Sequence, residues 1–100
     1  MIKHIVMVKL KEFSSTQEKL DNAGKFKTML EDLVELVPDL KAMEVGLNFN
    51  EKPSSYDVVL ISEFESKEGL DNYRVHPEHV KVLDFLKQIM DKTAVVDYES

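Results

Sequence analysis

The sequence has no cysteine and no tryptophan, and only three glycines and three prolines among its 100 residues. The absence of cysteine excludes disulfides, thiolate catalysis and cysteine-ligated zinc sites, and it is typical of a reducing compartment. No apolar run approaches the roughly 20 residues that span a bilayer. The three glycines stand far apart, which excludes the glycine-rich loops that hold nucleotide phosphates. We therefore expect a soluble cytoplasmic protein with no nucleotide-type cofactor and no membrane association.

Basic residues are also few. Thirteen lysines and arginines stand against 19 acidic residues, so the formal net charge is −6 with the histidines neutral. Affinity for nucleic acid comes mainly from clustered lysine and arginine side chains that neutralise phosphates. With no basic stripe, the sequence argues against nucleic acid as a partner.

The length predicts a single domain over residues 1–100. Alternation of residue types along the chain, with a continuous apolar run in the third segment, predicts four strands, at residues 2–10, 42–49, 56–65 and 93–98. Apolar residues at steps of three and four predict a long helix over 16–37 and a last helix over 77–91, with a short helix after Ser66. Ser15 and Glu18 fit a capping box, and Pro77 suits the first position of a helix.

The two longer helices are predicted to bury one apolar stripe each. For the first helix this stripe is Leu20, Ala23, Phe26, Leu30, Leu33, Val34 and Val37. For the last helix it is Val80, Leu83, Leu86, Ile89 and Met90.

The element order is β-α-β-β-α-β, which is typical of ferredoxin-like α+β folds, where helices cover one face of a four-stranded antiparallel sheet. The first and third strands carry large apolar residues on both faces, although one set of helices covers only one face. An uncovered apolar face needs a partner, and a second copy of the chain is the simplest one. The sequence therefore predicts a homodimer joined through the open face of the sheet.

The densest group of chemically capable residues lies where the short helix gives way to the last one. Tyr73, His76 and His79 fall within seven positions, and the break at Pro77 can turn Tyr73 toward His79. His4 lies on the same strand face as Val6 and could join them if that face is the one that the helices cover. An imidazole beside a phenol in an apolar pocket can transfer protons near neutral pH.

Each of these residues also has a structural interpretation. His4 could be a core histidine bonded to a carbonyl or hydroxyl, His76 could cap the last helix, and Tyr73 could hold a corner through a hydrogen bond. Three histidines could in principle bind a metal, but no carboxylate is clearly directed at them, and we expect no metal site.

Several segments of the sequence resemble the stress-responsive A/B barrel domain family, also called the dimeric α/β barrel (Dabb) family. The resemblance covers nearly the whole chain, and its most specific part is Tyr73-Arg74-Val75-His76-Pro77-Glu78-His79 together with Lys3-His4. Weaker parts are Val37-Pro38-Asp39-Leu40-Lys41, Val45-Gly46, Tyr56-Asp57-Val58-Val59-Leu60, Phe64-Glu65-Ser66 and Asp97-Tyr98.

The resemblance implies a ferredoxin-like protomer that pairs its sheet with that of a second protomer to form a barrel. It extends to a plant polyketide cyclase that uses no cofactor, whose catalytic histidine and tyrosine correspond to His79 and Tyr73. A further pocket histidine of that enzyme is replaced by Val58, and aromatic residues of its helices are replaced by smaller ones such as Leu30. The candidate catalytic residues are therefore His79 and Tyr73, and the candidate substrate-binding residues are His4, His76, Val6, Val58 and Leu30.

Three functions remain open at this point. The first is the binding of a small apolar or carbonyl-bearing metabolite between helices and sheet, because the expected pocket is apolar with few polar groups. The second is a cofactor-independent lyase, cyclase or isomerase in which His79 and Tyr73 form the acid/base pair. The third is a structural, stress-protective oligomer.

Overall fold

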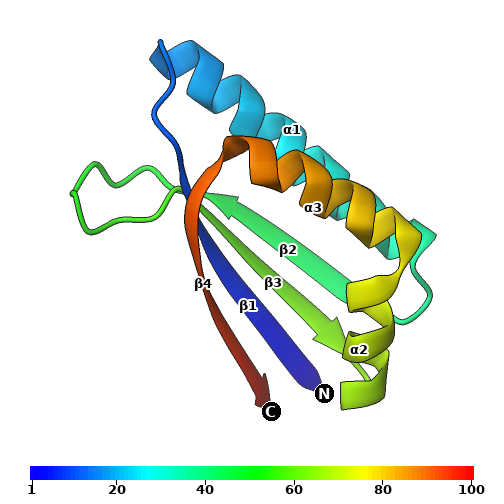
Figure 1. Ribbon diagram of the computed structural model, residues 1–100. Coiled ribbons are helices and arrows are strands. Elements are labelled where there is room, and N and C mark those ends of the chain that lie inside the picture. Colours follow the sequence, from blue (N-terminus) through cyan, green and yellow to red (C-terminus); the bar gives the residue numbers. More distant parts are fainter.

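A computed structural model describes all residues from Met1 to Ser100. The elements in chain order are β1 (Ile2–Leu10), α1 (Thr16–Leu36), β2 (Ala42–Leu47), β3 (Val58–Phe64), α2 (Lys67–Val75), α3 (Pro77–Ile89) and β4 (Met90–Glu99). All three helices lie on one side of the sheet, and α1 and α3 run beside each other (Figure 1). The predicted ferredoxin-like β-α-β-β-α-β topology is confirmed, with α2 as an additional short helix. No helix is both long and apolar enough to cross a membrane.

The four strands form one sheet in the order β2-β3-β1-β4, and every neighbouring pair is antiparallel. β1 is central, with Val6 paired to Leu60 of β3 on one side and to Val95 of β4 on the other. The two ends of the chain lie side by side, because Ser100 donates its backbone N–H to the Met1 carbonyl at 3.0 Å. β2 and β4 are the edges of the sheet.

Local sequence signals set the helix starts. The Ser15 hydroxyl accepts the backbone N–H of Glu18 at 3.1 Å, which is the expected N-cap of α1. The Glu18 carboxylate accepts the N–H of Ser14 at 3.2 Å rather than that of Ser15, so the capping box closes one residue earlier than the motif requires. Ser66 caps α2 in the same way as Ser15 caps α1.

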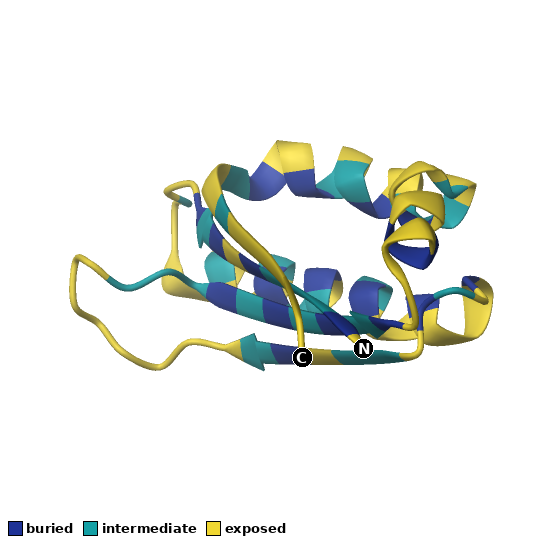
Figure 2. Ribbon diagram, turned by 90° about the horizontal axis from the view of Figure 1, so that it is seen from below, coloured by how far each residue is buried: buried dark blue, intermediate teal, exposed yellow.

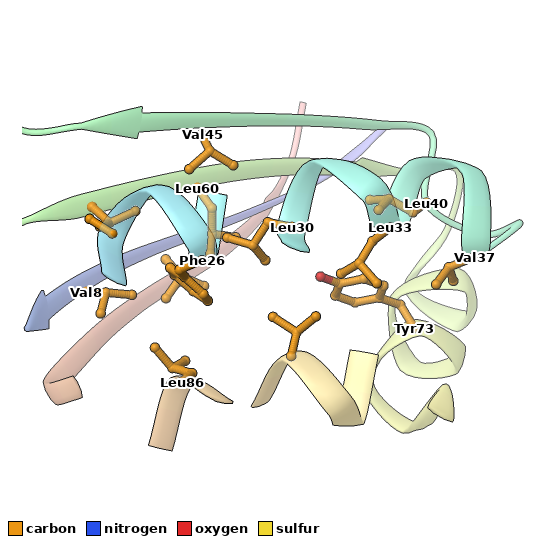
Figure 3. Packing of buried hydrophobic residues seen from close by; sticks show 14 of the residues in the cluster. Val8, Phe26, Leu30, Leu33, Val37, Leu40, Val45, Leu60, Tyr73 and Leu86 are labelled. Carbon is orange, nitrogen blue, oxygen red and sulfur yellow. The ribbon is translucent and has the colours of Figure 1, made fainter. Parts of the chain in front are cut away.

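The core fills the space between the helices and the facing side of the sheet (Figures 2 and 3). Along β3 the residues alternate between buried and half-buried, and the buried set faces the helices. Residues less than 2% exposed, in order of size, are Tyr73, Phe26, Phe64, Leu33, Val8, Val37, Val58 and Ser62.

Two parts of the predicted helix stripes are wrong. Leu20 and Val34 of α1 are exposed, and in α3 it is Val82 rather than Val80 that is buried. Because α3 begins at Pro77, its inward side runs through His79, Val82 and Leu86 at helical spacing, which turns Val80 toward solvent.

The predicted ends of several elements also differ. β3 spans Val58–Phe64 rather than 56–65, and β4 spans Met90–Glu99 rather than 93–98. α3 ends at Ile89, and Met90 already belongs to β4 because it pairs with Leu10. β2 ends at Leu47, so Phe49 lies in the following loop and is 97% exposed. Because β4 begins directly after α3, the helix cannot extend to residue 91 as predicted.

The second face of the sheet carries apolar side chains that the single chain does not cover. Alternation along the strands places Ile5 and Met7 of β1 there, with Ile61 of β3 and Val96 of β4 beside Ile5 in register. Met7 is 40% exposed and Val96 is 59% exposed, while Ile5 and Ile61 are half-buried. The sheet therefore has two apolar faces, as the sequence predicted.

Candidate functional site

An apolar pocket of about 220 Å³ lies between the helices and the sheet. Most of its wall is aliphatic or aromatic, and the polar lining residues are few. The lining residues are His4, Val6, Phe26, Leu30, Leu60, Tyr73, Arg74, His79, Val82, Leu83, Leu86, Thr93 and Val95. Four hollows of about 400 to 520 Å³ are larger, but none of them is lined by a histidine. The smaller pocket is therefore the candidate functional site.

Tyr73 and His79 are stacked in the wall of this pocket. Their ring centroids lie 4.0 Å apart, with 35° between the ring planes. Tyr73 lies in the last turn of α2 and His79 in the first turn of α3, so the break at His76 and Pro77 brings the rings together. The predicted proximity of Tyr73 and His79 is confirmed by this geometry.

The hydroxyl of Tyr73 is a hydrogen-bond donor without a protein partner. The residue is 1% exposed, and its oxygen points away from α2 into the interior (Figure 3). Every polar side-chain atom that is sealed from solvent has a hydrogen-bond partner, so the unpaired hydroxyl must retain access to the pocket. Burial raises the pKa of Tyr73 above its ordinary value, which keeps the phenol neutral and able to donate.

The tautomer of His79 follows from its one hydrogen bond. Its Nδ1 lies 3.3 Å from the backbone carbonyl oxygen of Arg74. A carbonyl can only accept, so Nδ1 carries the proton and Nε2 keeps its lone pair. Burial is the main cause that lowers the pKa of His79; the bond to the carbonyl opposes this shift, and the nearby charges of His4, Arg74 and His76 add to it. At neutral pH, His79 is therefore a neutral imidazole that can accept a proton at Nε2.

His4 reaches the same pocket from β1 and bonds to an acidic partner. Its Nδ1 forms a hydrogen bond with Oδ1 of Asp97, which lies opposite it in the β1–β4 register. Nη2 of Arg74 donates to the other oxygen of Asp97 at 2.9 Å. Asp97 and Arg74 were missed as site residues, because only the pairing of the first strand with the last brings Asp97 beside His4.

Two of the residues predicted to bind substrate lie outside the pocket wall. His76 is half-buried, and its Nδ1 accepts the backbone N–H of Glu78 at 3.1 Å, which makes it the N-cap of α3. Val58 is a core residue of β3, and it pairs with Val8 at the end of β1 away from His4. His4, Val6 and Leu30 do line the pocket with the catalytic candidates. No three histidine, aspartate or glutamate side chains converge as a group that could hold a metal ion.

These features define a class of protein: a ferredoxin-like domain with a small apolar pocket in which a tyrosine and a histidine are stacked. A sequence profile of the stress-responsive A/B barrel domain matches residues 2–100, and the chain belongs to this family.

Among its relatives, olivetolic acid cyclase from Cannabis sativa is 28% identical over 99 residues, covering 97% of this chain and 94% of the cyclase. A stress-response A/B barrel domain-containing protein from Arabidopsis thaliana is 30% identical, covering 98% of this chain and 88% of that protein. A dimeric ferredoxin-like protein of unknown function from Bacteroides fragilis has a similar structure, with a TM-score of 0.90 and 35% identity, covering 99% of this chain and 95% of that chain.

The lowered pKa of His79 predicts a pH dependence of stability. The unfolded chain binds a proton at the ordinary histidine pKa near 6.5, whereas the folded chain resists it, so the free energy of unfolding should fall as the pH drops below about 6.5. One such group contributes less than about 1.4 kcal/mol per pH unit. Urea denaturation over a pH series should show a shallower dependence in His79→Gln than in the wild type. Gln88→Ala, at an exposed position of α3, is the control and should keep the wild-type slope, whereas equal slopes in wild type and His79→Gln would contradict the interpretation.

Proposed function

We propose that this protein binds a small, mainly apolar carbonyl compound in the pocket beside Tyr73 and His79. The observation that carries the proposal is the Tyr73 hydroxyl, a donor with no partner in the protein that retains access to an apolar pocket. A ligand that covers this hydroxyl must supply an acceptor, because a donor left unpaired on burial is costly, and a carbonyl oxygen would satisfy it. The pocket volume of about 220 Å³ suits a ligand of roughly one ring, because drug-sized ligands occupy about 300–1,000 Å³.

The charges around the pocket favour a neutral ligand. Nη1 of Arg74 already donates to the carboxylate of Asp71, and Nη2 donates to that of Asp97. His79 is neutral for the reasons given above, and the aliphatic wall offers nothing to an ionised group. A charged ligand would lose its hydration without gaining a partner.

Acetophenone and ethylbenzene form a matched pair of probes, because they have nearly the same shape and differ in the carbonyl. In titrations followed by amide NMR, acetophenone should bind more tightly and shift the signals of residues that line the pocket. Loss of one neutral hydrogen bond weakens binding about two- to tenfold, so Tyr73→Phe should reduce the acetophenone affinity by this factor. Tyr98→Phe, on the other face of the sheet, is the control. Equal affinity for both probes, or no binding of either, would refute the proposal.

A second candidate function is catalysis of proton transfer next to a carbonyl. His79 presents an unprotonated Nε2, and Tyr73 presents a hydroxyl proton, in one mainly apolar pocket. In such a step, Nε2 removes a proton from the carbon beside the carbonyl, the C–H electron pair forms the enolate, and the phenol donates a hydrogen bond to its oxygen. The similarity to olivetolic acid cyclase over nearly the whole chain supports this alternative.

Hydrogen–deuterium exchange tests this step without knowledge of the natural substrate. The wild-type protein in D₂O should accelerate the incorporation of deuterium into the methyl group of acetophenone, measured by NMR. General base catalysis typically contributes about a hundredfold or more, and His79→Gln should lose that contribution. Gln88→Ala, at an exposed position of α3, should keep it. Acceleration that survives in His79→Gln would assign the reaction to another group.

We also infer that the chain forms a homodimer through the open face of its sheet. The face carries Met7 and Val96, which are exposed in the single chain, and Ile5 and Ile61, which are half-buried. Contiguous exposed apolar surface of this kind marks an interface in soluble proteins. The similar Bacteroides fragilis protein is described as dimeric, which supports the inference.

A charge placed in the centre of this face should separate the protomers. Ile61→Lys buries an unpaired ammonium in the proposed interface, so sedimentation or native mass spectrometry should change from two chains of 11.5 kDa to one. Val34→Lys adds the same charge at an exposed position of α1, and it should leave the mass unchanged. A wild-type protein that is monomeric at all concentrations, or an Ile61→Lys variant that remains dimeric, would contradict the inference.

A further inference from the structure

We propose that Arg74 is a positioning residue that orients both pocket histidines, His79 through its backbone carbonyl and His4 through its guanidinium and Asp97. The proposal rests on the proposed function, because it concerns the same pocket. Arg74 lies at the end of α2 and lines the inner pocket as well as a hollow of about 400 Å³ on the outside, so it stands between the two.

The carbonyl of Arg74 is free for His79 because the two groups that could compete for it are removed. In a continuous helix, this carbonyl would accept the N–H of residue 78. Glu78 instead donates its N–H to Nδ1 of His76, and Pro77 has no N–H at all. The orphan carbonyl at the end of α2 therefore accepts Nδ1–H of His79 at 3.3 Å. In this way, His76 contributes to the site without lining the pocket.

The guanidinium of Arg74 acts on His4 through Asp97. One oxygen of Asp97 binds Nδ1 of His4, and the other accepts from Nη2 of Arg74 at 2.9 Å. With a partner on each oxygen, the carboxylate is held against rotation. Nη1 of Arg74 donates to Asp71 one turn earlier on α2 at 3.2 Å, which holds the guanidinium in turn.

Both imidazoles are thereby held at Nδ1 from outside the pocket. The two bonds occupy Nδ1 of each ring and leave Nε2 of both without a partner in the protein, in residues that line the pocket. A ligand would then meet two ring nitrogens of defined protonation as well as the Tyr73 hydroxyl. This arrangement requires a planar group with several donors at position 74, which arginine provides and lysine does not.

Burial along this chain of contacts indicates an orienting rather than a stabilising role. The side chains are 69% exposed at Asp71, 47% at Arg74, 31% at Asp97 and 13% at His4. Ion pairs this exposed add little to the free energy of unfolding. Removal of the guanidinium should therefore disturb the histidine without unfolding the protein.

The test is a measurement of histidine tautomers in the ¹⁵N-labelled full chain, by NMR of the ring nitrogens in mildly alkaline buffer. In the wild type, both His4 and His79 should show a protonated Nδ1 and an unprotonated Nε2. In Arg74→Met and in Asp97→Asn, His4 should lose its fixed tautomer and show averaged nitrogen shifts, while His79 keeps its own because the carbonyl remains. Asp71→Asn, which removes the other partner of Arg74, should leave the His4 tautomer fixed.

The outcomes separate this proposal from the proposed function, since no ligand is needed. A His4 signal that is unchanged in both Arg74→Met and Asp97→Asn overturns the proposed role of the guanidinium. A His79 ring with its proton on Nε2 overturns the proposed role of the Arg74 carbonyl. Equal thermal unfolding midpoints for wild type and Arg74→Met are expected. A tautomer change that occurs only with loss of the folded amide spectrum would reduce the role of Arg74 to stability and also overturn the proposal.

Discussion

The antiparallel pairing of β1 with β4 is the constraint on which the rest of the structure depends. It joins the first and last ten residues of the chain, makes β1 the central strand, and sets Asp97 directly opposite His4. It also extends the sheet to β4, whose Thr93 and Val95 complete the pocket wall. Without this pairing, β1 would be an edge strand and the pocket would be open on one side.

The second decisive feature is the break between α2 and α3. His76 ends one helix and caps the next, and Pro77 starts α3 without an N–H to satisfy. The break stacks Tyr73 against His79 and leaves the Arg74 carbonyl for the imidazole. In a continuous helix, Tyr73 and His79 would point about 120° apart around the axis, because they are six positions apart. The Arg74 carbonyl would accept the N–H of residue 78 and would not be free to set the tautomer. The same two residues that interrupt the helix therefore determine the chemistry of the pocket.

The pocket and the open face use opposite sides of the same strands. His4 and Val6 of β1 face the helices, while Ile5 and Met7, which alternate with them, face outward. A change of register by one residue would exchange the two sets, and it would place the histidine in the proposed dimer interface. Because β1 carries apolar residues on both of its faces, it can line the pocket on one side and contribute to the proposed interface on the other.

Much of the fold was predictable because its signals are local. The caps at Ser15 and Ser66, the proline at the start of α3, and the two-residue alternation of β1 and β3 each act within a few positions. The errors at Leu20 and Val80 have the opposite cause. The rotation of a helix against the sheet decides which of its apolar residues are buried, and no local pattern reveals that rotation.

The sequence by itself determined the element order, the second apolar face and the proximity of Tyr73 to His79, since these depend on periodicity and on one short break in the chain. Only the tertiary structure decided the roles of His76, Asp97 and Arg74. His76 was a candidate for the pocket, but it is committed to a helix start, whereas Asp97 and Arg74 are separated by 23 positions and still bind each other. Contacts between distant segments depend on how β4 returns to β1, and that packing is a property of the whole core rather than of any local sequence.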